Sequence, residues 1–345
     1  MRNIIIIIAL IGYFSVAHCQ TFKGTVYDRS TDSTLSFATV YISGTSIGTY
    51  SDIHGNFELD ISKYSSIPIT ISLLGYYSVT LSEHNSNKIY DIYLSPKINE
   101  LNEVLVTGKK GKWETYLRIF KREFLGETEN ASECDILNEN DLRFFYNSDS
   151  STLREISLKP ILIRNKALGY TITYYLDKFK FSRKRITNGQ LTETCAILGN
   201  YLFKDDLLIL SESEKSKIEE RRKSAYLGSR MHFFRSLYNG NLIQRGEYSI
   251  SISDNGSFTK GFSINSKTPI NSDSFIIKKD SLSGYLKNAG ELSVTYKWMN
   301  TLINIKWDSV YFEKDGYYDP VGIEFSGDMS KQRIGDLLPF EYFIK

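Results

Sequence analysis

Residues Phe22 to Leu59 read FKGTVYDRSTDSTLSFATVYISGTSIGTYSDIHGNFEL, and this stretch decides the fold of the first part of the chain. Ala38, Val40 and Ile42 take every second position, which places their side chains on one face of a sheet. The glycine-containing segment from Asp52 to Asn56 is typical of a tight turn. The stretch therefore predicts two strands, a hairpin and a third strand.

The same alternation continues to about residue 98 and predicts a β-sandwich over residues 20–98. Tyr90, Ile92 and Leu94 repeat the period of two. Two sheets can bury such apolar faces against each other, so Val40 and Phe57 are expected in the core.

The stretch from Phe22 to Leu59 resembles the carboxypeptidase-regulatory-like domain. The resemblance implies a prealbumin-like Greek-key β-sandwich without catalytic residues. It also implies a compartment, because many bacterial outer-membrane proteins carry this domain as an N-terminal appendage. A zinc carboxypeptidase is not expected from the domain alone.

Residues 1–19 have the pattern of a signal peptide. Arg2 precedes an apolar run from Ile4 to Ile11, which is too short to span a bilayer, and small residues lead to Cys19. Cleavage after Cys19 would leave Gln20 as the new N-terminus; alternatively, Cys19 would be the lipidated residue of a lipoprotein. Both alternatives predict export to the periplasm or the periplasmic face of the outer membrane.

Residues 99–112 are interpreted as a linker. The segment from Ile98 to Gly108 looks like the one that follows this domain in TonB-dependent outer-membrane transporters. The rest of the chain is too short for a plug and a barrel of about 22 strands. The resemblance leaves an accessory of such a transporter as one alternative function.

Residues 113–345 predict a larger, mostly antiparallel β domain with two helices, so the whole chain is expected to be mainly β. Trp113, Leu117, Phe120 and Phe124 recur at helical spacing, and a second helix is expected from about Glu214 to Tyr238. The region also resembles the C-terminal region, of unknown function, in a family of secreted bacterial proteins. The segments that carry this likeness are Phe124–Thr128, Leu168–Leu176, Ala225–Leu237 and Gln332–Pro339.

Net charge, apolar segments and cysteine content limit the partners and the compartment that the sequence predicts. The 42 basic and 40 acidic residues become 41 and 40 when residues 1–19, with Arg2 alone charged, are removed, so we expect no nucleic-acid partner. After Cys19, the sequence contains no apolar segment that predicts a transmembrane helix. An oxidising compartment would allow Cys134 and Cys195 to form a disulfide.

We expect no metal, cofactor or catalytic residues. The histidines after residue 19, His54, His84 and His232, lack the spacing of zinc ligands. Gly44 to Gly48 fits the nucleophile-elbow pattern, but Ser46 lies between two predicted strands, whereas that motif joins a strand to a helix.

A carbohydrate-binding or carboxylate-dependent glycan-processing protein is the first alternative function. Asp315, Asp319 and Glu324 flank the aromatic pair Tyr317 and Tyr318. Acid/base chemistry needs two such carboxylates in a cleft. A solvated hairpin with Asp-Gly turn chemistry explains the same residues.

Arg230, His232 and Arg235 form the most concentrated cationic group on a predicted helix. They could bind a carboxylate, a phosphate-bearing lipid group or an acidic segment of a partner. Alternatively, they form an internal network with Arg333 and Asp336. The interpretation that covers the whole sequence is an exported, non-catalytic binding or assembly module of the cell envelope, whose partner is an envelope or outer-membrane protein or a glycan.

Overall fold

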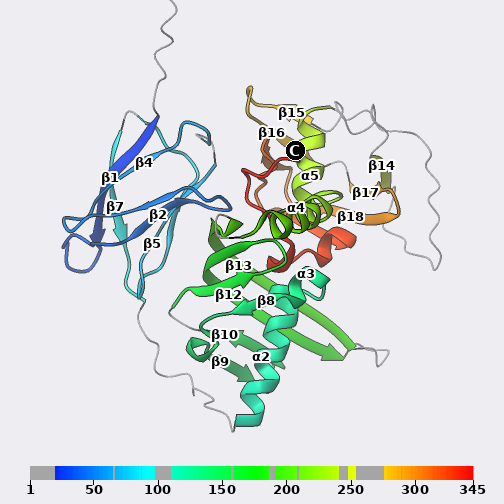
Figure 1. The fold of residues 1–345 in the computed structure, drawn as a ribbon, viewed down its shortest axis with the longest axis horizontal. Helices are drawn as coiled ribbons and strands as arrows, with labels where there is room; N and C mark the ends of the chain where they lie inside the picture. Colours follow the sequence, from blue (N-terminus) through cyan, green and yellow to red (C-terminus); the bar gives the residue numbers. More distant parts are fainter. Residues whose placement is uncertain are drawn as a thin grey trace, which may run out of the picture.

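The computed structural model describes residues 20–64, 67–86, 88–97, 110–156, 159–185, 191–207, 210–240, 248–253, 276–288 and 290–344. The expected signal peptide and the segment 98–109 of the linker region lie outside the described residues. The described chain is mainly β, as predicted, with largely antiparallel sheets (Figure 1).

Two small sheets form the N-terminal sandwich. Val40 and Phe57 are buried between them, as predicted. Gly24 pairs with Tyr90, and a Cβ at Gly24 would lie 2.0 Å from the Tyr90 carbonyl oxygen, so only glycine fits there. The first sheet has the order β4 (Asn56–Asp60), β1 (Thr21–Asp28), β7 (Ile89–Leu94), and the second β3 (Gly48–Tyr50), β2 (Thr39–Ile42), β5 (Ile69–Ser72), β6 (Val79–Leu81).

Strand β2 is buried on both faces, although its sequence alternates as in a strand with one solvated face. The second face packs on the rest of the chain. Tyr41 stacks on Tyr175 with ring centroids 5.3 Å apart, and the Tyr175 hydroxyl donates to Thr39 Oγ1 at 2.9 Å. The larger part of the protein therefore covers the outer face of the sandwich at β2 (Figure 1).

The loop between β2 and β3 joins the sandwich to the larger region by main-chain hydrogen bonds. Gly44 N donates to Tyr201 O at 2.8 Å, and Phe203 N donates to Thr45 O at 2.8 Å. Glu341 Oε1 accepts from the backbone N and the hydroxyl of Ser46, at 2.6 and 2.7 Å. These contacts fix the position of the sandwich.

A six-stranded sheet organises the larger region. Its long hairpin is β12 (Tyr170–Arg185) and β13 (Leu191–Asp205). Two strands pair with the other edge of β12, namely β11 (Ile161–Asn165) and β10 (Thr152–Glu155). On their outer edges, β8 (Cys134–Ile136) pairs with β11 and β9 (Phe144–Asn147) pairs with β10.

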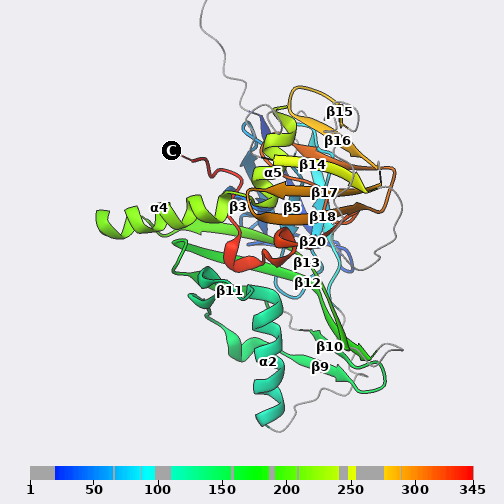
Figure 2. The same cartoon turned by 90° about the vertical axis from the view of Figure 1, so that its right-hand side faces the viewer.

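Helix α2 (Lys110–Leu125) packs on this sheet (Figure 2). Its buried Phe120 and Phe124 contact Phe179 and Tyr174 with ring centroids 4.8 and 4.9 Å apart. The predicted helical stripe is confirmed, and the helix begins at Lys110, before the expected Trp113. The short α3 (Glu129–Ser132) and the 3-10 turn η1 (Glu139–Asp141) follow.

The helix expected from Glu214 to Tyr238 is two helices, so that prediction is wrong in this detail. Helix α4 (Glu212–Tyr226) ends before Gly228, which has a φ of +78°, and α5 (Arg230–Tyr238) starts with Ser229 as its N-cap. A Cβ at Gly228 would lie 2.1 Å from Met299 Cε, so the turn also needs the space.

Helix α5 packs between two further sheets. Phe233 contacts Tyr248 of one, and Phe234 contacts Phe312 of the other. Strands β15 and β16 were not expected from the sequence. The first sheet has the order β14 (Tyr248–Ser253), β17 (Glu291–Tyr296), β18 (Met299–Ile305), β20 (Ile323–Gly327). The second has the order β15 (Ile276–Lys278), β16 (Ser283–Lys287), β19 (Ser309–Glu313). The 3-10 turns η4 (Asp328–Lys331) and η5 (Ile334–Asp336) follow β20.

Candidate functional site

A groove of about 1050 Å³ lies between α4 and the polar face of the six-stranded sheet. Its floor comes from residues that face one another on neighbouring strands. Arg164 of β11 pairs with Thr171 of β12, and Thr171 pairs with Lys204 of β13. Paired residues point to the same face of a sheet, so these three side chains form one row.

The opposite face at the same level is apolar. The neighbouring row contains Ile136, Ile163, Ile172 and Phe203, all of which are buried in the core under α2. The alternation along β11, β12 and β13 therefore directs apolar side chains to the core and charged ones to the groove.

One face of α4 supplies the opposite wall. Glu214, Lys217, Ile218 and Arg221 line the groove, and their spacing of three and four residues places them on one helical face. Ser211 and Glu214 form a capping box that defines the start of the helix. Ile218 is buried against Gly169, where a Cβ would lie 3.1 Å from Ile218 Cδ1.

Arg222 holds α4 on the turn between β11 and β12 and is 3% exposed. Its Nε donates to Leu168 O at 2.8 Å, and its Nη2 donates to Gly169 O at 3.2 Å. The guanidinium also lies 3.8 Å from the ring centroid of Tyr170, and burial raises the pKa of that phenol. One buried cation thus fixes the helix to two carbonyls and an aromatic ring.

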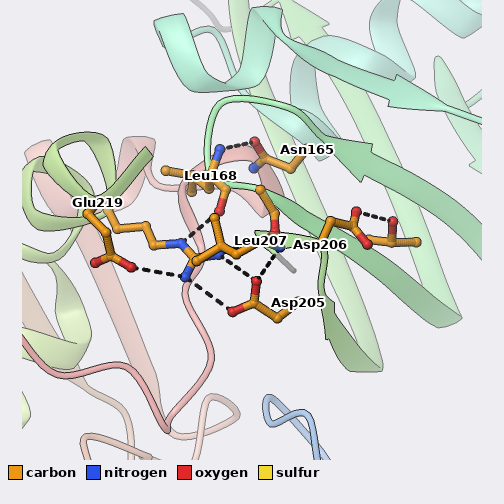
Figure 3. A network of polar contacts seen from close by, with 9 residues as sticks. Asn165, Leu168, Asp205, Asp206, Leu207 and Glu219 are labelled. Atoms are coloured by element: carbon orange, nitrogen blue, oxygen red, sulfur yellow. Dashed lines mark hydrogen bonds and ion pairs between the residues drawn. The ribbon is translucent and has the colours of Figure 1, made fainter. Parts of the chain in front are cut away.

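Two carboxylates flank this guanidinium (Figure 3). Asp205 accepts hydrogen bonds from the Arg222 guanidinium at 3.2 and 3.3 Å. Glu219, also on α4, forms an ion pair with Arg222 at 3.5 Å. Asp205 Oδ1 also accepts from Leu207 N at 2.9 Å. Both carboxylates are part of the support beneath the groove.

The turn at the end of the floor is fixed by its own polar contacts (Figure 3). Asn165 Oδ1 accepts from Leu168 N at 2.9 Å, and its Nδ2 donates to Gly335 O at 2.9 Å. Thr171 Oγ1 donates to Asp206 Oδ2 at 2.7 Å. These contacts make the floor a preformed surface.

Some charges of the lining are already engaged. Arg221 pairs with Glu133 at 2.5 Å, and Lys166 pairs with Asp135 at 2.6 Å and lowers the pKa of that carboxyl. Hydrogen bonds from Ser211 lower the pKa of Glu214.

Three cations of the lining differ from these. Within the part of the chain that the structure describes, no hydrogen bond or ion pair engages the exposed side chains of Arg164, Lys204 and Lys217. The groove therefore presents these three cations on its floor and on its helical wall, beside the carboxylates of Asp206, Glu214 and Glu220.

The predicted cationic group on α5 lies in the interior. His232 and Arg235 are 6% and 4% exposed, and Arg230 is half-buried. Arg235 donates to Asp315 O, Phe340 O and Tyr342 O at 2.9, 3.0 and 2.7 Å. Its guanidinium is satisfied by backbone carbonyls.

Arg230 donates to Gln332 O at 2.8 Å and to the Tyr318 hydroxyl at 3.1 Å. His232 Nδ1 accepts from Gly228 N at 3.1 Å, so this nitrogen carries no proton. The three side chains thus belong to an internal network. The structure does not place a partner at this cluster, and binding there stays a prediction.

The expected internal partners of this cluster make other contacts. Asp336 accepts from Thr128 and Asn130, both near 3 Å, and Arg333 donates to Ser330 O. Burial raises the pKa of Asp336. The sequence could not show whether Arg230 and Arg235 donate to a carboxylate or to backbone carbonyls.

The Cys134–Cys195 disulfide is not formed, because both residues are free thiols. Cys134 of β8 lies in a row of paired residues that crosses the sheet and ends at Asp205 of β13. Cys195 lies ten residues away from Asp205 along β13. About ten residues of strand correspond to roughly 30 Å, which no disulfide spans. Burial raises the pKa of each thiol to about 12.

The carboxylates considered for glycan chemistry do not converge. Glu324 pairs with Lys306 at 2.8 Å, and Asp319 Oδ1 accepts from Val321 N at 2.9 Å. Burial raises the pKa of Asp315. Among the residues that the structure describes, no group of three His, Cys, Asp or Glu side chains could hold a metal ion.

Glu313 is a buried acid that sequence reasoning missed. It is 2% exposed on β19, and burial raises its pKa to about 7 although the Tyr311 hydroxyl donates to it at 2.8 Å. The groove residues were missed as well. Their only sequence signal is the spacing of Glu214, Lys217 and Arg221 on one helical face.

A model of the CarboxypepD_reg-like domain family matches residues 22–106. The N-terminal sandwich lies within this match and is similar to that domain family. The resemblance that residues 22–59 predicted is thereby confirmed, and CarboxypepD_reg-like domains are regulatory and non-catalytic. No curated protein matches the chain. Among the described helices, none has the length and apolar character needed to cross a membrane.

Proposed function

We propose that this protein is an exported, non-catalytic binding or assembly module of the cell envelope, and that the groove at α4 is its binding site for another envelope protein. The observation that carries the proposal is a set of three exposed cations around one preformed groove, Arg164, Lys204 and Lys217, which form no hydrogen bond or ion pair with the residues that the structure describes. Concave sites with a few convergent polar groups are the usual form of binding sites.

Two further features support the proposal. The signal-peptide pattern of residues 1–19 favours export. The CarboxypepD_reg-like domain is held against β13 by the loop that contains Ser46, and it contributes no lining residue to the groove. In this proposal the CarboxypepD_reg-like domain supports the binding region and performs no chemistry.

A glycan-processing role receives less support from the geometry. None of the groove's lining residues is aromatic, so the groove lacks a stacking platform for sugar rings. The three carboxylates near Tyr317 and Tyr318 are separately engaged or half-buried. We therefore propose a protein partner.

The test is recovery of partners from solubilised envelope. The tagged full chain is compared with a groove variant carrying Arg164→Gln, Lys204→Gln and Lys217→Gln. A control carries Lys178→Gln, Lys180→Gln and Lys184→Gln, which change three exposed lysines on β12 outside the groove. The groove variant should lose proteins that the control retains. Fractionation that finds the chain in the cytoplasm, or an unchanged set of partners, would contradict the proposal.

A further inference from the structure

We infer that the groove binds an acidic peptide segment of the partner, with at least two carboxylates separated by uncharged residues. This inference rests on the proposed function, because it names the class of ligand for the same groove. It is carried by the arrangement of the lining charges on β11, β13 and α4.

The cations are distributed over both walls of the groove, which favours a ligand with more than one anionic group. Arg164 and Lys204 lie on either side of Thr171 in one row, two strand spacings apart, which is about 10 Å. Lys217 extends from the opposite wall. Arg164 and Lys204 have long side chains and could share a single inorganic phosphate on the floor, which would leave Lys217 without an anion. Two carboxylates on one chain can reach cations on both walls.

The acidic residues of the lining restrict the ligand further. Glu214 and Glu220 of α4 and Asp206 after β13 lie among the cations. A densely charged polyanion would be repelled by these carboxylates, and like charges in close contact are costly. A peptide can place its carboxylates at the cations and its backbone N–H groups near the acids.

The remaining lining also matches a peptide. Ala167, Leu210 and Ile218 contribute apolar surface between the charged groups. The volume of about 1050 Å³ lies just above the usual range of about 300–1,000 Å³ for small-molecule sites and admits several residues. Ion pairs formed at such an open site are screened by salt, so the affinity should fall as ionic strength rises.

The experiment measures binding of a labelled octapeptide, in which Glu alternates with Ser, to the full chain by fluorescence anisotropy. A peptide with Gln in place of Glu is the ligand control, and inorganic phosphate is the competitor. The protein variants are the triple groove variant and the triple β12 control described above. Circular dichroism and the thermal midpoint establish that each variant is folded.

The expected result is saturable binding of the Glu peptide to the wild type and the β12 control, and about tenfold weaker binding to the groove variant, as three exposed ion pairs would give. Binding should weaken at 0.5 M salt, and equimolar phosphate should not compete. The inference is overturned by equal binding to groove and control variants, by binding of the Gln peptide with the same affinity, or by no binding to the wild type.

The two proposals fail in different ways. If the groove variant loses envelope partners but the Glu peptide does not bind, the ligand class is wrong and the proposed function stands. If the Glu peptide binds in the groove but envelope partners do not depend on it, the ligand class stands and the proposed function is wrong.

Discussion

Two groups of cationic side chains in this protein lie in opposite environments. Arg230 and Arg235 are close in sequence, and their guanidinium groups donate to backbone carbonyls in the interior. Arg164, Lys204 and Lys217 are far apart in sequence and lie exposed around one groove. The comparison teaches that clustering of charge along a helix can indicate structure, whereas a binding surface can assemble from isolated residues.

The largest effect should come from the buried group. Arg235→Ala leaves one buried and two partly buried carbonyls without their donor, and an unsatisfied buried acceptor costs about 1–3 kcal/mol, so we expect a loss of about 3 kcal/mol. Denaturant unfolding measures this change. Arg164→Ala is the matched control and should stay within about 0.5 kcal/mol. Equal effects of the two substitutions would abolish the distinction between the two groups.

A pH experiment tests whether the region around α5 also buries an acid. The pKa of Glu313 is raised to about 7 in the folded chain, above its ordinary value of 4.5. The folded state thus binds the proton more tightly, and the resulting stabilisation is present below about pH 4.5 and is lost as the pH rises through about 7. The shift corresponds to about 3 kcal/mol.

The measurement is the difference in unfolding free energy between the wild type and Glu313→Gln, from pH 4.5 to 8. Glutamine keeps the shape and stays neutral, so the wild type should lose stability relative to the variant as pH rises. A difference that does not vary with pH would show that Glu313 titrates normally. Tyr311→Phe serves as a second variant, because it removes the hydroxyl that donates to the carboxylate.

Arg222 is a buried cation in the same region as the exposed cations of the groove, so it allows buried and exposed cations to be compared within one helix. Arg222→Met keeps the length of the side chain but removes the hydrogen bonds to Leu168 O and Gly169 O, so we expect a loss of about 2 kcal/mol. The neighbouring Arg221→Met removes a half-exposed ion pair with Glu133 and should cost at most about 1 kcal/mol. Reversed magnitudes would mean that α4 is held by its surface pairs.

The smallest effect on stability is expected in the groove. Lys204→Gln and Lys217→Gln remove no hydrogen bond or ion pair present among the described residues, so each thermal midpoint should change by no more than about 2 °C. Differential scanning calorimetry measures this. A midpoint lowered by several degrees would place these lysines with the structural cations.

Period-two alternation was sufficient for the sandwich core, as Val40 and Phe57 illustrate, because a strand with one buried face must repeat every second residue. It was not sufficient for Tyr41. That residue occupies a position expected to face solvent and is buried against Tyr175, from a strand more than a hundred residues away. No local pattern contains that contact.

The helical region shows the same limit. The spacing of Trp113, Phe120 and Phe124 predicted α2, since an amphipathic face has a period that depends only on the helix itself. The break comes from Gly228, with its φ of +78°, and from Ser229, which caps α5, whereas the apolar spacing alone indicated one continuous helix.

Local alternation and turn residues were enough to predict a mainly β chain with an N-terminal sandwich, because they encode strands and their buried faces, and the resemblance of residues 22–59 supplied the family of that sandwich. Which cations are buried and which are exposed depends on long-range packing. Whether Arg235 meets a carboxylate, a carbonyl or water depends on segments far away in the chain. The row of Arg164, Thr171 and Lys204 exists only because the register of three strands brings them together.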